Sequence, residues 1–304
     1  MKKILQSPGW RTVAGFMVLF LAVWLATVFL GVVPNFLLRA LNASEQVRLW
    51  LGGTLSRGGM MLVTVWLSAW MLRRVTGLRA GETIYRRHLG WWQDLLFGLF
   101  LGFFAMALLF GLEIALGWLS VNGSVWQAGG WDEALGAFWL ALLANGLAAV
   151  GEEAMFRGYF LTGLKRAWGP VVGLLVMSIP FGASHLLVTG ASETNWALFT
   201  LMLALPGMLL GWAYLRTGSL WLPMGIHFTW NFLQADVFNL TGEPSQNLVG
   251  FLTQKSGPDW FMGTSYGIEV GLAGLVALSV VGVGVWLWTR PSKNSIDQSQ
   301  KYEG

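Results

Sequence analysis

Long apolar stretches recur along the whole chain and constrain its fold more than any other feature. Each is about 20 residues or longer, enough to cross a hydrocarbon core about 30 Å thick. Every backbone amide in such a span must be hydrogen-bonded inside the segment, and the alternating pattern of membrane barrel strands is absent, so the spans are expected to be helices. The sequence therefore predicts an all-α, polytopic transmembrane helical bundle of about eight helices, at residues 12–33, 49–72, 94–119, 133–164, 169–189, 196–215, 219–239 and 266–289.

The composition supports a membrane protein and excludes other classes. Only 11% of the 304 residues are charged, whereas an ordinary soluble domain carries about 25%. The chain has no cysteine, so disulfides, thiolate metal ligands and cysteine nucleophiles are all excluded. The net charge of +4 does not indicate nucleic acid, because the basic residues lie in short loops between apolar spans.

Those basic residues predict the orientation of the bundle. Most Lys and Arg lie before the first span, after the last, or in loops such as 73–87 and 165–166, all on one side if the number of crossings is even. Both termini are therefore expected in the cytoplasm, and the location is a cell membrane. We divide the chain into membrane helices 1–132, a core 133–240, an outer loop and last helix 241–289, and a polar cytoplasmic tail 290–304.

Ionisable side chains inside the spans mark two places, because each costs several kcal/mol in a membrane and needs a compensating partner. Arg57 and Glu113 fall at similar depths in the second and third spans, and we expect them to form an interhelical ion pair. A denser cluster comes from three other spans and consists of Glu152, Glu153, Arg157, His185, His227 and Asn231.

The spacing within this cluster is consistent with one polar site. Glu153 and Arg157 are four residues apart, so they can pair on one helix face, and Glu152 is rotated away as an unpaired carboxylate suited to general base or acid work. His227 and Asn231 share the same spacing. Each histidine alone is also explained as a packing residue bonded to a neighbouring helix. The combination favours a functional site, since an apolar interior is often at least as stable.

Three motifs in order resemble a known family. Glu152 to Arg157 reads E-E-x-x-x-R, Phe181 to His185 reads F-x-x-x-H, and His227 to Asn231 reads H-x-x-x-N. This set is similar to that of the CAAX-protease and bacteriocin-processing (CPBP, or Abi) family of intramembrane endopeptidases, which includes the eukaryotic Ras-converting protease. The resemblance covers about residues 135–240.

The resemblance implies peptide-bond hydrolysis by an activated water. By similarity, Glu152 is the base that activates the water, and Glu153 and Arg157 maintain the surroundings of its carboxylate. His185 shares the water or shuttles its proton. His227 and Asn231 are implied to stabilise the oxyanion. The implied partners are the lipid bilayer and a peptide or membrane-protein substrate, with no nucleic acid.

Several alternatives remain open at this point. Two histidines and a glutamate can complete a catalytic zinc site, but no H-E-x-x-H motif is present, and a metal-free water activated by Glu152 is favoured. A non-catalytic membrane scaffold or bacteriocin-immunity protein of the same fold is the main alternative function. A transporter is a weaker one, because no two related halves with paired broken helices are found. The residues identify neither the substrate, prenylated or not, nor the oligomeric state.

Overall fold

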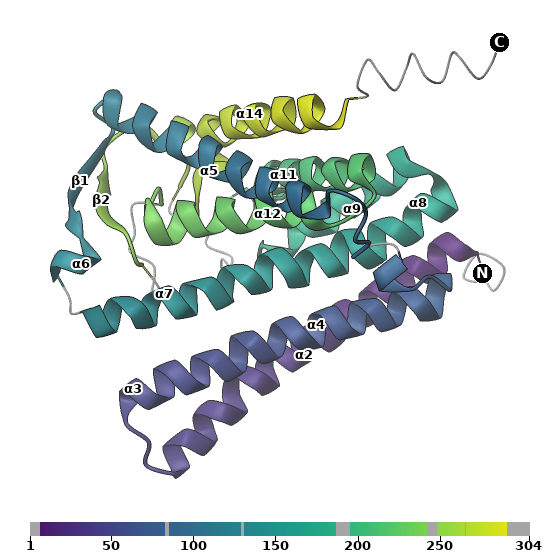
Figure 1. Ribbon diagram of the computed structural model, residues 1–304, viewed down its shortest axis with the longest axis horizontal. Coiled ribbons are helices and arrows are strands. Elements are labelled where there is room, and N and C mark those ends of the chain that lie inside the picture. The colour runs from purple at the N-terminus through teal and green to yellow at the C-terminus, as the bar shows by residue number, and fades with distance from the viewer. Residues whose placement is uncertain are drawn as a thin grey trace.

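The chain forms a bundle of membrane-length helices, as predicted. The computed structural model describes residues 7–82, 85–128, 131–186, 195–241, 248–264 and 266–290. Within these residues, six helices are long and apolar enough to cross a membrane: Pro8–Ala40, Glu45–Thr76, Trp91–Ala115, Ala134–Trp168, Trp196–Thr217 and Leu272–Thr289. In Figure 1 they are α2 (Pro8–Ala40), α3 to α4 (Glu45–Val47, π-helical η1 Arg48–Gly52 and Gly53–Thr76), α5 (Trp91–Ala115), the segment from α7 (Trp131–Gly146) to α8 (Thr162–Trp168), α11 (Trp196–Thr217) and α14 (Leu272–Thr289).

The two other expected spans are helices as well, but shorter. The first is α9 (Pro170–Ser184), and part of its expected range, 187–189, lies outside the described residues. The second is α12 (Trp221–Asn231), which continues into π-helical η5 (Phe232–Val237). At 15 residues, α9 is only about 22 Å long. Phe181 and Gly182 near its end are buried, and α9 packs along α11.

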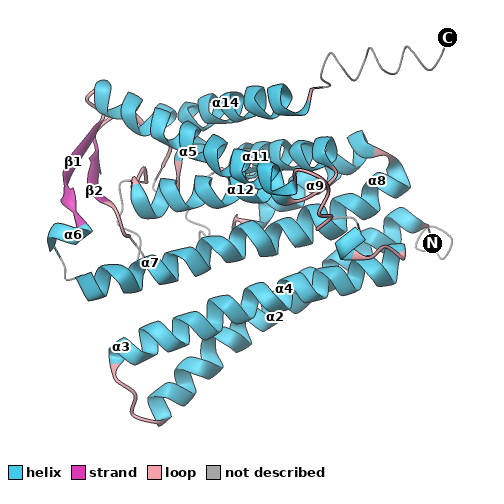
Figure 2. Cartoon of the chain, viewed as in Figure 1, coloured by secondary structure: helices cyan, strands magenta, loops and turns pink. Residues whose placement is uncertain are grey.

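A long helical segment runs through the middle of the bundle (Figures 1 and 2). It consists of α7 (Trp131–Gly146), π-helical η3 (Leu147–Glu152), π-helical η4 (Ala154–Leu161) and α8 (Thr162–Trp168). The hairpin of α2 and α4 packs against one side of it, while α9, α11 and α12 contact the other side. The long segment therefore presents its polar residues to the helices that carry the second and third motifs.

A small sheet interrupts the all-helical pattern, and the sequence analysis did not predict it. Strand β1 (Leu119–Ser124) pairs antiparallel with β2 (Phe251–Lys255), with a bulge between Val121 and Gly123. The sheet lies at one end of the bundle (Figure 2). Short elements complete the connections: η2 (Ala80–Glu82), α6 (Val125–Ala128), α13 (Asp259–Met262) and η6 (Ile268–Val270).

The expected ion pair between Arg57 and Glu113 is wrong. No ion pair joins them in the described part of the chain, and neither carboxylate oxygen of the fully buried Glu113 has a hydrogen-bond partner there. The charged neighbour of Glu113 is Lys255 in β2. Burial lowers the pKa of Lys255, whose Nζ donates to the carbonyl of Gly263 at 2.8 Å. The similar depths of Arg57 and Glu113 in their spans did not imply contact, because α4 packs on α2 and on the segment from α7 to α8 rather than on α5.

Helices α5 and α12 cross with their backbones in direct contact. A Cβ atom at Gly98 would meet the carbonyl oxygen of Leu222, and one at Gly225 would lie 2.5 Å from the carbonyl oxygen of Leu95. Small residues at such crossings let membrane helices approach closely. This contact fixes α12, which carries the third motif, against α5.

A methyl group at this crossing is expected to destabilise the protein. Gly98→Ala should lower the free energy of unfolding by about 1–3 kcal/mol, because backbone atoms cannot yield to it. The matched control is Gly111→Ala on the same helix, where nothing lies within 4 Å of a Cβ. Thermal unfolding of the purified variants in one detergent measures both. Equal melting temperatures for the two variants would contradict the close crossing.

Candidate active site

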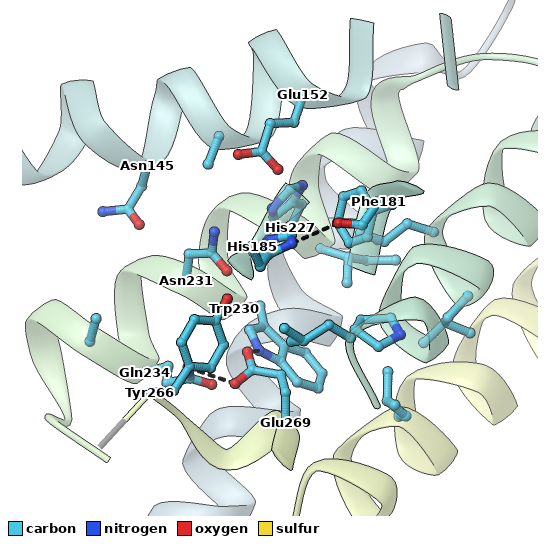
Figure 3. Close-up of a pocket in the computed structure, with 18 of the residues that line it drawn as sticks. Asn145, Glu152, Phe181, His185, His227, Trp230, Asn231, Gln234, Tyr266 and Glu269 are labelled. Atoms are coloured by element: carbon cyan, nitrogen blue, oxygen red, sulfur yellow. Dashed lines mark hydrogen bonds between the residues drawn. The ribbon is translucent and has the colours of Figure 1, made fainter. Parts of the chain in front are cut away.

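One pocket brings the three motifs together. It has a volume of about 370 Å³ and lies between the long central segment, the end of α9, α11, α12, η5 and the turn before α14. Its polar lining residues are Asn145, Glu152, His185, His227, Asn231, Gln234, Asp236, Tyr266 and Glu269. Four of the six residues predicted for the site therefore face one cavity (Figure 3).

The remaining two, Glu153 and Arg157, form a buried ion pair beside the pocket. Arg157 Nη1 lies 2.8 Å from Glu153 Oε1, and both side chains are fully buried. Arg157 also donates from Nη2 to the carbonyl of Gly207 at 2.9 Å and lies over the ring of Phe181, 4.3 Å from its centroid. The guanidinium thus ties the first motif to α11 and to the Phe of the second.

His227 is held by the same carboxylate. Its Nδ1 lies 2.9 Å from Glu153 Oε1, with the imidazole and the carboxylate both buried. Since the carboxylate accepts, Nδ1 carries a hydrogen, and Nε2 can donate only when the ring is protonated. Glu153 therefore compensates Arg157 and orients His227 at the same time.

His185 is oriented by its own helix. Its Nδ1 lies 2.8 Å from the carbonyl oxygen of Phe181, one turn earlier, which makes Nδ1 the protonated nitrogen. The rings of Phe181 and His185 meet edge to face, 4.9 Å apart. The F-x-x-x-H spacing thus places a carbonyl acceptor and a ring next to the imidazole, which limits its rotation.

Glu152 is the carboxylate that faces the pocket. It is only partly buried, and its Oε2 has no hydrogen-bond partner among the described residues. Figure 3 shows its carboxylate directed toward the two histidines. Glu152 ends η3, and η4 begins after Glu153, so π-helical turns flank the pair. Such turns are frequent at functional sites.

Several pocket residues were missed by the sequence analysis. Asn145 donates to Asp236 at 2.7 Å, and Glu269 accepts from Trp230 Nε1 at 2.7 Å and from Gln234 Nε2 at 3.0 Å. Helical spacing from His227 was a usable signal for Trp230 and Gln234, which follow it by three and seven residues. Tyr266 and Glu269 lie at the start of the expected last span, 266–289, and neither was assigned to the site. An ionisable side chain inside a span, as Glu269 is there, was a usable signal.

The donor set of the pocket does not match the zinc alternative. In the described ranges, no group of three or more His, Asp or Glu side chains is placed to hold a metal ion. The side chains in this arrangement do not fit a zinc ion.

Comparison with known proteins shows a family similarity in the core of the chain. Residues 134–233 match the model of a family described as type II CAAX prenyl endopeptidase Rce1-like. No curated protein and no solved structure matches the chain. The match confirms the resemblance predicted from the three motifs and supports, at the level of the family, a CAAX-type protease in a multi-pass membrane protein.

Proposed function

We propose, on the premise that residues 134–233 form an Rce1-like protease core, that this protein is an intramembrane endopeptidase of the cell membrane. Its substrate is a membrane-associated protein or peptide, and the core 133–240 carries the chemistry. One observation supports this most directly: Glu152, a carboxylate beside an already neutralised Glu153, faces a cavity that His185 and His227 also line.

The chemistry requires only residues of this pocket and a water molecule. Glu152 takes a proton from the water, and the hydroxide attacks the carbonyl carbon of the scissile bond. The tetrahedral oxyanion collapses, the C–N bond breaks, and the proton passes to the leaving amine directly or through His185. The products are a carboxylate and an amine, with no covalent enzyme intermediate.

Glu153 and Arg157 act as positioning residues in this proposal. Arg157 neutralises Glu153, so Glu153 does not add a second negative charge next to Glu152. Glu153 in turn fixes the imidazole of His227. His227 in its protonated form and the amide of Asn231, one turn further along α12, supply hydrogen bonds to the oxyanion.

The main competing function is a membrane scaffold or immunity protein that binds a partner without cleaving it. A folded, membrane-inserted Glu152→Gln variant separates the two, because a scaffold keeps its biological effect while a protease loses it. A transporter would instead show solute flux into vesicles that depends on the same residues.

The proposed function is tested by comparing protein termini in membranes. Membranes containing the wild-type protein should yield new amino termini that are missing from membranes containing Glu152→Gln at equal abundance. Mass spectrometry of labelled termini identifies the cleaved bond and thereby the substrate. Identical sets of termini in the two membranes would refute proteolysis.

Removal of metal ions is expected to leave activity unchanged. Purified enzyme is incubated with a chelator, and the metal content and the activity of the same sample are measured. It should still cleave the identified peptide fully when it holds less than about one-tenth of a zinc ion per chain. Loss of activity that returns on addition of zinc would establish a metalloenzyme and overturn the metal-free mechanism.

A further inference from the structure

One side of the pocket is formed by residues outside the segment that matches the family model. Tyr266 and Glu269 lie in the turn before α14, more than 30 residues after position 233, and both line the cavity. In Figure 3 they lie below Asn231, on the side opposite Glu152, and the hydroxyl of Tyr266 points up toward Asn231.

Glu269 attaches this turn to the helix that carries the third motif. Its carboxylate accepts from Trp230 and from Gln234, which lie on α12 and η5 beside His227 and Asn231. Gly267 allows the turn to pack this closely, because a Cβ there would contact both the Glu269 carboxylate and the Gln234 amide. The turn that carries Tyr266 is therefore held against the helix that carries the third motif.

The ring of Tyr266 is fixed between two aromatic neighbours. It meets Phe199 edge to face at 4.9 Å between centroids and lies 6.3 Å from the imidazole of His185 at an interplanar angle of 86°. Burial first, and then the charges of Glu269 and Glu152, raise the pKa of Tyr266 above its ordinary value. The phenol is thus protonated at neutral pH, and its O–H is a hydrogen-bond donor beside the site.

We propose that Tyr266 is a catalytic residue whose hydroxyl donates a hydrogen bond to the oxyanion formed at the scissile carbonyl. This inference rests on the proposed function. Nδ1 of His227 already serves Glu153, so a neutral His227 has no second N–H, whereas the phenol supplies a donor in either state of that ring. Tyr266 and Asn231 would together form a donor pair on the side of the pocket opposite Glu152, the base in the proposed reaction (Figure 3).

The test is Tyr266→Phe, which keeps the ring and removes only the hydroxyl. The probe is an internally quenched peptide copied from the sequence whose cleavage in membranes depends on Glu152, and the enzyme is the full chain in proteoliposomes. We expect kcat to fall about a hundredfold with KM within about threefold, since the lost interaction is made in the transition state. The matched control is Tyr214→Phe. The hydroxyl of Tyr214 is hydrogen-bonded to Thr162 at 2.7 Å, and Tyr214 does not line the pocket.

The possible outcomes separate this inference from the proposed function. A wild-type kcat in Tyr266→Phe, or a raised KM with unchanged kcat, overturns the role of Tyr266 and leaves the protease assignment intact. An equal loss of kcat in the Tyr214→Phe control also overturns it, because any buried phenol would then have the same effect. If no terminus depends on Glu152, the proposed function fails and this inference fails with it.

Discussion

The Glu152→Gln variant is expected to lose more than about a thousandfold in kcat, near the upper range for removal of a general base. Glutamine matches the shape of glutamate but cannot take the proton of the attacking water. Because Glu152 Oε2 makes no hydrogen bond with the described residues, the substitution breaks no hydrogen bond to them at that atom. Cleavage of the peptide probe in proteoliposomes measures the loss, and thermal unfolding of the same sample should be unchanged.

The chain offers a matched control for this substitution. Glu113 on α5 is a fully buried carboxylate, neither of its oxygens has a hydrogen-bond partner in the described chain, and it does not line the pocket. Glu113→Gln should keep kcat within about twofold of wild type, because it removes a charge remote from the reacting atoms. A similar loss in both variants would indicate a general effect of buried charge and would contradict the role of Glu152 as base.

The second large effect is expected for Arg157→Met. This change leaves the carboxylate of Glu153 fully buried without its cation, which should lower the free energy of unfolding by about 3–5 kcal/mol. It also removes the hydrogen bond to the carbonyl of Gly207. Thermal or denaturant unfolding in detergent micelles measures the change. Arg166→Met, at an exposed position on α8, is the control and should shift stability by less than about 0.5 kcal/mol.

A double variant tests the cause of that instability. If the uncompensated charge is responsible, Glu153→Gln combined with Arg157→Met should be more stable than Arg157→Met alone, because no buried charge is then left unpaired. If the two substitutions destabilise additively instead, packing around Arg157 rather than its charge explains the loss, and the positioning role assigned to the pair is wrong.

The membrane class and the central motifs were predictable because both depend on local features of the chain. Apolar length alone predicts a spanning helix, and residues four apart share a helix face wherever the helix packs. The Glu153–Arg157 pair is therefore found at 2.8 Å, as its spacing indicated. The convergence of Glu152, His185, His227 and Asn231 on one pocket was expected from the number of polar groups in apolar spans, each of which needs a compensating neighbour.

Other features depended on which helices are neighbours, and the sequence analysis did not find them. Arg57 and Glu113 have matching depths but lie on helices that do not pair, and Glu113 instead has Lys255 as its charged neighbour. Strands β1 and β2 are each short, and the paired residues Leu119 and Lys255 lie far apart in the sequence. Neither strand has a local signal strong enough to predict the pairing.

Local features of the sequence thus determined that this protein lies in a membrane, that its spans are helical and which residues are available for catalysis. Helix packing set which of these residues meet. Glu269 reaches Trp230 across 39 residues and Asn145 reaches Asp236 across 91 residues, and at such separations spacing along the chain no longer implies proximity. In a bilayer, where lipid is as apolar as the helix surfaces, close backbone crossings such as that of Gly98 and Gly225 select the neighbouring helices. The turn that carries Tyr266 reaches the pocket through the hydrogen bonds of Glu269 to Trp230 and Gln234.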